Sequence, residues 1–239
     1  MNVLVVGDSW GCYFADIQPN AQWSAKNSKL SWLIQYQGHL IFNCAIFGGT
    51  NLQTLNEGKT YLQERLKYKK VDLIIWFYTE LGREELLPKF LPKYTSNYVS
   101  RFGTESVIDT LDWLHTETTK KVSEIRNMCP NAKWAIIGGH ASLYRPEDYD
   151  WAEFVIEDLM SEIVGYQVPT SHFQNFDLYN NPNKTKNLDI LTSEMSKYEN
   201  ILSIKKSHPD IFIDGVHPTL GVINEFAIDK IFNHFSKKT

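Results

Sequence analysis

Short apolar runs alternate with helical patterns along most of the 239-residue chain. Val3–Val6 is a continuous apolar run that ends at Gly7, which is typical of a strand buried on both faces in a parallel sheet. Similar runs recur four times, and the last is the weakest: Leu40–Ile46, Val71–Tyr78, Lys133–Ile137 and Ile211–Ile213. The pattern therefore predicts a parallel sheet of about five strands.

Helical spacing of apolar residues separates these runs. Apolar residues recur every three or four positions in Ser31–Tyr36, in Leu52–Lys67 and most clearly in Glu105–Met128. Strands that alternate with helices favour right-handed βαβ crossovers and an open sheet with helices on both faces. We therefore predict an α/β fold that forms a single domain over residues 1–239.

Two stretches interrupt this rhythm and are predicted as insertions, at about residues 83–103 and 142–209. The first reads as a loop with short helices, and the second contains predicted helices at Asp150–Ile163 and Asp189–Tyr198. Both follow strand ends, where open α/β sheets bind ligands, so we expect them to cover a site. Their many aromatic residues suit sugar rings or flat acyl groups, or else pack the insertions onto the body of the domain.

Composition narrows the function classes. The chain has 24 basic and 28 acidic residues, a net charge of −4, which argues against general nucleic-acid binding. Three widely spaced cysteines without a CxxC pair fit a reducing compartment and indicate no metal site. The apolar run at the N-terminus is too short for a signal peptide, and no stretch approaches the length of a membrane span. We expect a cytoplasmic protein with no membrane span.

Candidate chemistry begins with Ser9, which lies at a strand end, two residues beyond Gly7, and opens a helical segment in the sequence Gly7-Asp8-Ser9. Unpaired backbone N–H groups at a helix start favour negative charge, so a hydroxyl there is well placed for nucleophilic attack. The same Asp-Ser pair is also a common helix N-cap, and that structural interpretation stays open.

A carboxylate and an imidazole lie three residues apart near the other end of the chain, at Asp214 and His217. A carboxylate bonded to one ring nitrogen fixes the tautomer, so that the other nitrogen can take a proton from a serine hydroxyl. Alternatively, Asp214 caps a helix that starts at Pro218, and the two interpretations are compatible.

Together these blocks resemble the GDSL, or SGNH, family of serine esterases and lipases. The family's middle block, Asn-x-Gly-x-x-Gly, is similar to the segment Asn43–Gly49, in which Ala45 replaces the first glycine. The resemblance implies a three-layer α/β/α flavodoxin-like sandwich and an acyl-serine intermediate. It implies the following site: Ser9 as nucleophile, His217 as base and then acid, Asp214 orienting His217, and the N–H groups of Ser9 and Gly48 as the oxyanion hole. It implies no metal and no organic cofactor.

The family's third block departs from the pattern, because Thr79-Glu80 stands where the family has an oxyanion-binding Asn. Losing one such donor typically costs about 100- to 1000-fold in turnover, and an ionised Glu80 would repel the oxyanion. Three alternatives remain: Glu80 points away, burial protonates it, or Asn51 or Thr79 substitutes as the donor. His140 follows the fourth predicted strand, where it would bind substrate, donate to an oxyanion or cap its loop.

The resulting prediction is a serine ester hydrolase of the acetylesterase type, acting on a small-molecule or carbohydrate ester. Two alternatives remain: a catalytically weak relative that binds a glycan or a protein, and an acyltransferase. The remaining histidines have no partner motif and are predicted as surface or core residues: His39, His115, His172, His208 and His234.

Overall fold

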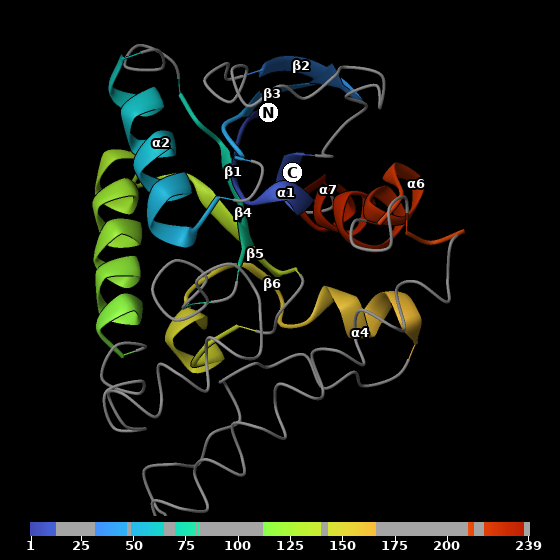
Figure 1. The fold of residues 1–239 in the computed structure, drawn as a ribbon. Coiled ribbons are helices and arrows are strands. Elements are labelled where there is room, and N and C mark those ends of the chain that lie inside the picture. Colours follow the sequence, from blue (N-terminus) through green and yellow to red (C-terminus); the bar gives the residue numbers. More distant parts are fainter. Residues whose placement is uncertain are drawn as a thin grey trace, which may run out of the picture.

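A six-stranded sheet forms the centre of the molecule (Figure 1). The structure is a computed structural model that describes residues 1–12, 32–46, 49–64, 70–79, 81, 112–139, 143–165, 210–212 and 218–236, with backbone only for 32–34 and 220. The strands are β1 (Asn2–Gly7), β2 (Trp32–Tyr36), β3 (His39–Asn43), β4 (Leu73–Tyr78), β5 (Lys133–Gly138) and β6 (Phe154–Ile156). Their order across the sheet is β2-β3-β1-β4-β5-β6.

Five of the six strands are parallel, and only the edge strand β2 pairs antiparallel, with β3. Without β2, the order across the sheet is second, first, third, fourth, fifth in chain order, which is that of flavodoxin-type doubly wound sheets. The strand order reverses at β1, because β3 pairs on one side of it and β4 on the other. Ligands of such sheets bind outside the carboxyl ends of the strands at this switch point.

Alternate residues of the buried strands face two separate hydrophobic clusters. In β1, Leu4 and Val6 face the first cluster, which is completed by α2 (Asn51–Glu64) and a helix over residues 112–128. Val3 and Val5 face the second, with α4 (Leu159–Val164) and the C-terminal helical elements. Those elements are α6 (Leu220–Ile223), the π-helix η3 (Asn224–Ile228) and α7 (Asp229–Ser236). Helices therefore cover both faces of the sheet, an arrangement compatible with a three-layer α/β/α sandwich (Figure 1).

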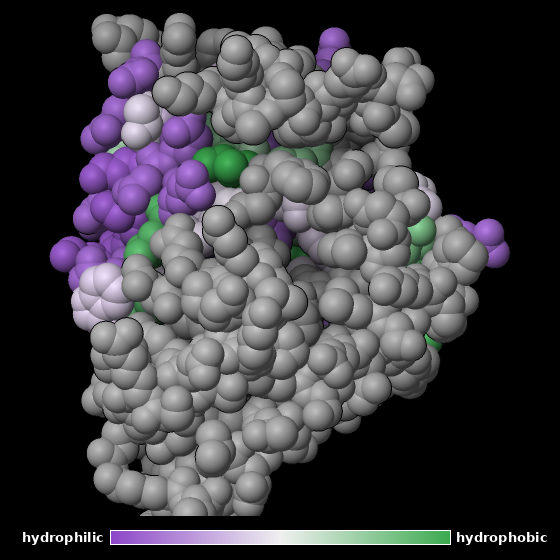
Figure 2. Space-filling view, viewed as in Figure 1, coloured by the Kyte–Doolittle hydropathy of each residue, from purple (hydrophilic) through white to green (hydrophobic). Residues whose placement is uncertain are grey.

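Helix α2 shows how the sequence specifies one such layer. Its buried residues Leu55, Gly58 and Leu62 recur every three or four positions and therefore share one face. Gly58 lets the helix approach β1 closely, because a Cβ there would lie 2.4 Å from Cγ1 of Val6. The faces of α2 and of the 112–128 helix that point away from the sheet form the hydrophilic surface at the left of Figure 2.

The predicted strands at Val3–Val6, Val71–Tyr78 and Lys133–Ile137 are confirmed within one or two residues at each end. The strand predicted at Leu40–Ile46 starts one residue earlier and ends at Asn43, and α2 covers the described part of Leu52–Lys67. Residues 112–128 are helical as predicted.

The helix predicted at Ser31–Tyr36 is wrong, because Trp32–Tyr36 is strand β2. A two-residue turn joins it to β3, with Gln37 at φ 46° and Gly38 at φ 78°. Two successive positive φ angles are typical of the type I′ hairpin turn, which matches the natural twist of paired strands. The apolar spacing of these residues is compatible with a helix or a strand, and pairing with β3 makes the segment a strand.

The helix predicted at Asp150–Ile163 is confirmed only over its last five residues, which belong to α4. Its middle forms β6, and α4 begins only after Asp158, whose carboxylate caps it by accepting from the Ser161 N–H at 3.0 Å. The predicted insertion at 142–209 therefore begins with residues that complete the sheet. Of the strand predicted at Ile211–Ile213, the described residues form one isolated bridge, between Phe212 and Pro218, and Ile213 lies outside the described residues. The predicted insertion at 83–103 and the helix at Asp189–Tyr198 lie outside the described residues.

Candidate functional site

Ser9 lies just beyond the carboxyl end of β1, at the switch point of the sheet. Gly7 of β1 pairs in register with Phe77 of β4, so Ser9 and Thr79 each follow that pair by two residues. Ser9 begins helix α1 (Ser9–Cys12) and is 4% exposed. The hydroxyl therefore occupies the place where doubly wound sheets usually bind ligands.

The backbone around Ser9 depends on Gly7, which has φ +143°. A Cβ at Gly7 would lie 2.5 Å from the carbonyl oxygen of Phe77, so only glycine lets β1 and β4 approach this closely. The next residue, Asp8, is buried, and its carboxylate accepts from the Trp10 N–H at 3.0 Å. Its carbonyl accepts from Gly11 and Cys12 N–H groups, which closes the first turn of α1.

Asp8 also affects the neighbouring thiol. Burial, and to a lesser degree the charge of Asp8, raises the pKa of Cys12. The thiol therefore stays protonated at neutral pH and does not compete with Ser9 as a nucleophile.

A buried amide, Asn43, joins the turn after β1 to the segment after β3. Its Nδ2 donates to the Gly11 carbonyl at 3.1 Å, and its Oδ1 accepts from the Ala45 N–H at 2.9 Å. A Cβ on Gly11 would lie 3.1 Å from the Cβ of Ala45, so the two segments are in close contact. Asn43, the first residue of the segment that resembles the family's middle block, is thus a structural clamp beside Ser9.

A second amide clamp joins α2 to the end of β4. Asn51 Nδ2 donates to the Thr79 carbonyl at 2.6 Å, and Asn51 Oδ1 accepts from the Thr79 N–H at 3.0 Å. Asn51 is 3% and Thr79 1% exposed. Both polar ends of the Asn51 amide are therefore used to hold the main chain that leads from β4 into Glu80.

The structure thus brings three of the predicted site residues, Ser9, Asn51 and Thr79, to the carboxyl edge of the sheet. Asn51 binds the Thr79 backbone with both ends of its amide, whereas the sequence predicts it as a candidate donor to an oxyanion or substrate. The other predicted site residues lie outside the described residues: Gly48, Glu80, His140, Asp214 and His217.

Within the described ranges, no group of three or more histidine, cysteine, aspartate or glutamate side chains is arranged to hold a metal ion. In the same part of the chain, no helix combines the length and apolarity that crossing a membrane requires.

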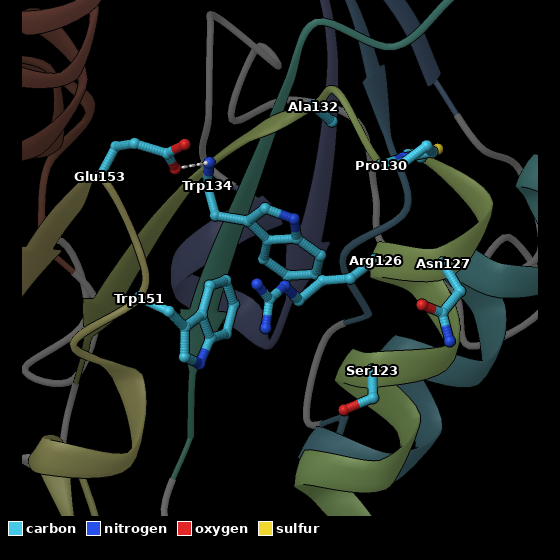
Figure 3. A pocket seen from close by; sticks show the side chains of 9 residues that line it. Ser123, Arg126, Asn127, Pro130, Ala132, Trp134, Trp151 and Glu153 are labelled. Atoms are coloured by element: carbon cyan, nitrogen blue, oxygen red, sulfur yellow. Dashed lines mark hydrogen bonds between the residues drawn. The ribbon is translucent and has the colours of Figure 1, made fainter.

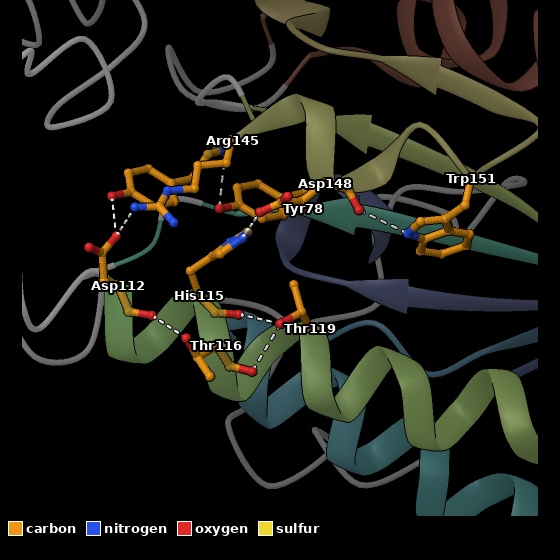
Figure 4. Close-up of polar contacts among 9 residues, drawn as sticks. Tyr78, Asp112, His115, Thr116, Thr119, Arg145, Asp148 and Trp151 are labelled. Carbon is orange, nitrogen blue, oxygen red and sulfur yellow. Dashed lines mark hydrogen bonds and ion pairs between the residues drawn. The ribbon is translucent and has the colours of Figure 1, made fainter.

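Sequence reasoning missed a contact between a buried histidine and an exposed carboxylate (Figure 4). His115 of the 112–128 helix is 4% exposed, and its Nε2 lies 2.7 Å from Oδ2 of Asp148. Asp148 belongs to the 3₁₀ helix η2 (Pro146–Tyr149), 33 residues away in the chain. The only local signal was the position of His115 on the apolar face of its helix, beside the buried Leu114.

The chain matches no protein-family model, and a comparison with curated proteins likewise finds no match.

Proposed function

We propose that the protein is a serine ester hydrolase of the SGNH/GDSL type, with Ser9 as its nucleophile. The observation that carries the proposal is the position of Ser9 directly after β1 at the switch point. Its surroundings add to this, because the close Gly7–Phe77 contact and the Asn43 clamp fix the backbone on both sides of the serine. A fixed backbone is what a nucleophile needs to meet a carbonyl carbon repeatedly in one geometry.

In this proposal His217 takes the proton of the Ser9 hydroxyl, and Asp214 orients the imidazole. Two described residues that flank this pair support it. Phe212 and Pro218 form a β-bridge, and the Thr219 N–H donates to the Ile211 carbonyl at 2.7 Å. Phe212 is buried in the same hydrophobic cluster as Trp10, the residue that follows Ser9. The two ends of the segment that carries the proposed dyad therefore meet on the face of the sheet that Trp10 also covers.

The reaction would proceed in two steps. Ser9 Oγ attacks the ester carbonyl while His217 takes its proton, and the collapse of the tetrahedral intermediate expels the alcohol, protonated by His217. Water then attacks the acyl-serine with His217 as base, which releases the acid and restores the hydroxyl. The N–H groups of Ser9 and Gly48 would stabilise the negative oxygen in both steps.

The burial of Ser9 limits the acyl groups that this site would accept. Because Ser9 is 4% exposed, a short acyl chain should reach its hydroxyl more readily than a long one. We therefore propose acetyl esters, carried by a small molecule or a carbohydrate, as the substrate class.

The experiment is a burst assay with p-nitrophenyl acetate and p-nitrophenyl butyrate on the wild type, Ser9→Ala and the matched control Ser236→Ala. Ser236 is exposed at the end of α7 and is not one of the proposed site residues. We expect faster release from the acetate, a mass increase of one acetyl group, and loss of both in Ser9→Ala alone. Equal turnover in all three proteins would refute Ser9 as the nucleophile.

A further inference from the structure

A polar groove runs between the 112–128 helix and the segment from Arg145 to Glu153. It consists of two adjacent cavities of about 390 and 400 Å³, and Ser123, Arg126 and Trp151 line both. The cavities adjoin at these three residues, and we call the two cavities together the Arg126 groove. Figure 3 shows the half that ends at Glu153, and Figure 4 shows residues of the half that contains Asp148.

Arg126 is held in one orientation by an aromatic support. Its guanidinium carbon lies 3.9 Å from the ring centroid of Trp151, and Figure 3 shows its side chain reaching from the helix toward Trp134 and Trp151. Trp134 packs edge-on against Trp151, with the ring centroids 5.5 Å apart. Trp151 Nε1 donates to the Asp148 carbonyl at 3.0 Å. No carboxylate of the described residues forms an ion pair with Arg126. Its N–H groups are therefore pre-positioned donors for a ligand.

The other polar groups of the groove are mainly acceptors. The hydroxyls of Thr116, Thr119 and Ser123 donate to carbonyls of their own helix, so only their lone pairs can serve a ligand. The carboxylates of Asp148 and Glu153 each use one oxygen, toward His115 Nε2 and the Trp134 N–H, respectively. For the second oxygen of each, the described part of the chain provides no hydrogen bond.

These donors and acceptors favour one class of ligand. Hydroxyl groups can donate to the carboxylates and serine or threonine oxygens and can also accept from the Arg126 guanidinium. The lining carries two carboxylates, Asp148 and Glu153, and two guanidiniums, Arg126 and Arg145. Because Arg145 is already paired with Asp112, an anionic ligand would gain no net attraction from these charges. The polar lining also disfavours an acyl chain, because the hydrogen-bonding groups would lose solvent without compensation.

We propose that the Arg126 groove binds a neutral oligosaccharide of about two sugar rings, with one ring at each of the two adjoining cavities. The inference is independent of ester hydrolysis. The groove borders the hydrophobic cluster of Val122 and Trp134, whereas Trp10, next to Ser9, belongs to the cluster on the opposite face of the sheet. Binding can therefore be measured without any catalytic readout.

The test is an NMR titration of the ¹⁵N-labelled protein with cellobiose, maltose and N,N′-diacetylchitobiose, followed at the indole N–H of Trp151. We expect saturable shifts with at least one of these sugars, at a Kd on the order of 1 mM. Arg126→Gln and Asp148→Asn should each weaken binding about tenfold, the effect of losing a hydrogen bond to a charged group. Lys120→Gln makes the same charge change as Arg126→Gln at an exposed position of the same helix, and it should leave the Kd within about twofold.

Circular dichroism of each variant establishes that the fold is retained. Saturable shifts with a neutral disaccharide that are weakened by Arg126→Gln and by Asp148→Asn support the proposal. It is overturned by the absence of saturable shifts with all three sugars, or by unchanged binding in both groove variants. Tighter binding of glucuronate or of glycine than of the neutral sugars would also overturn it, because the groove would then select a charged ligand.

Discussion

Replacing Asn51 by alanine removes both hydrogen bonds that hold the Thr79 main chain beside the proposed active site. The two contacts measure 2.6 and 3.0 Å, and both residues are at least 97% buried. A buried hydrogen bond contributes about 1 kcal/mol net, and desolvated groups that lose their partner cost about 1–3 kcal/mol. We therefore expect Asn51→Ala to lower the free energy of unfolding by about 2–4 kcal/mol.

Urea unfolding, followed by tryptophan fluorescence and circular dichroism, measures this loss. The matched control is Gln53→Ala, an exposed position in the same first turn of α2, which should change the unfolding free energy by less than about 0.5 kcal/mol. Asn51→Asp retains an acceptor for the Thr79 N–H but places a carboxylate oxygen against the Thr79 carbonyl, so it should regain stability when acid protonates the carboxylate. If Asn51→Ala is as stable as Gln53→Ala, the Asn51 clamp does not stabilise the end of β4.

Three further predictions concern stability. Gly7→Ala should lower the free energy of unfolding by at least about 3 kcal/mol or prevent folding, because its Cβ would lie 2.5 Å from a carbonyl oxygen. The control Gly221→Ala, at an open helical position, should be neutral or stabilising in thermal melts. Tyr149→Phe removes a buried hydroxyl that has no hydrogen-bond partner in the described structure, so it should be neutral or stabilising in urea unfolding. Tyr144→Phe loses a 2.8 Å hydrogen bond to a carboxylate and should be less stable in the same assay. Two lysines lower the pKa of Glu124 from 4.5 to about 2, so the stability that Glu124 contributes is present above pH 4.5 and is lost as the pH falls toward 2. A ¹³C NMR titration should show this pKa. In Glu124→Gln, the free energy of unfolding should depend less on pH between 4.5 and 2.

The central strands could be predicted because they are buried on both faces. A continuous apolar run such as Val3–Val6 has few alternatives to a strand when a glycine ends it. The segment Trp32–Tyr36 could not be assigned from its own residues, because its apolar spacing fits a helix as well as a strand. The local signal for a hairpin is the glycine in Gln37-Gly38, because a two-residue turn with positive φ angles favours glycine.

The candidate site was predictable only where its chemistry is local. Ser9 follows directly from a strand, a glycine and a helix start, all within a few residues. The clamp between Asn51 and Thr79 spans 28 residues, and the pair His115 and Asp148 spans 33. Such partners meet only after the sheet and its helices have assembled, so no local pattern reveals them.

The most direct test of the proposed chemistry is to map where a fluorophosphonate probe attaches, by peptide mass spectrometry of the labelled protein. Fluorophosphonates modify a serine that a neighbouring base has activated, so the label reports both the nucleophile and its activation. We predict a single modified peptide that contains Ser9, with labelling strongly reduced in His217→Ala. Labelling of a different residue, or hydrolysis of p-nitrophenyl acetate by a protein whose Ser9 stays unmodified, would contradict the proposed nucleophile.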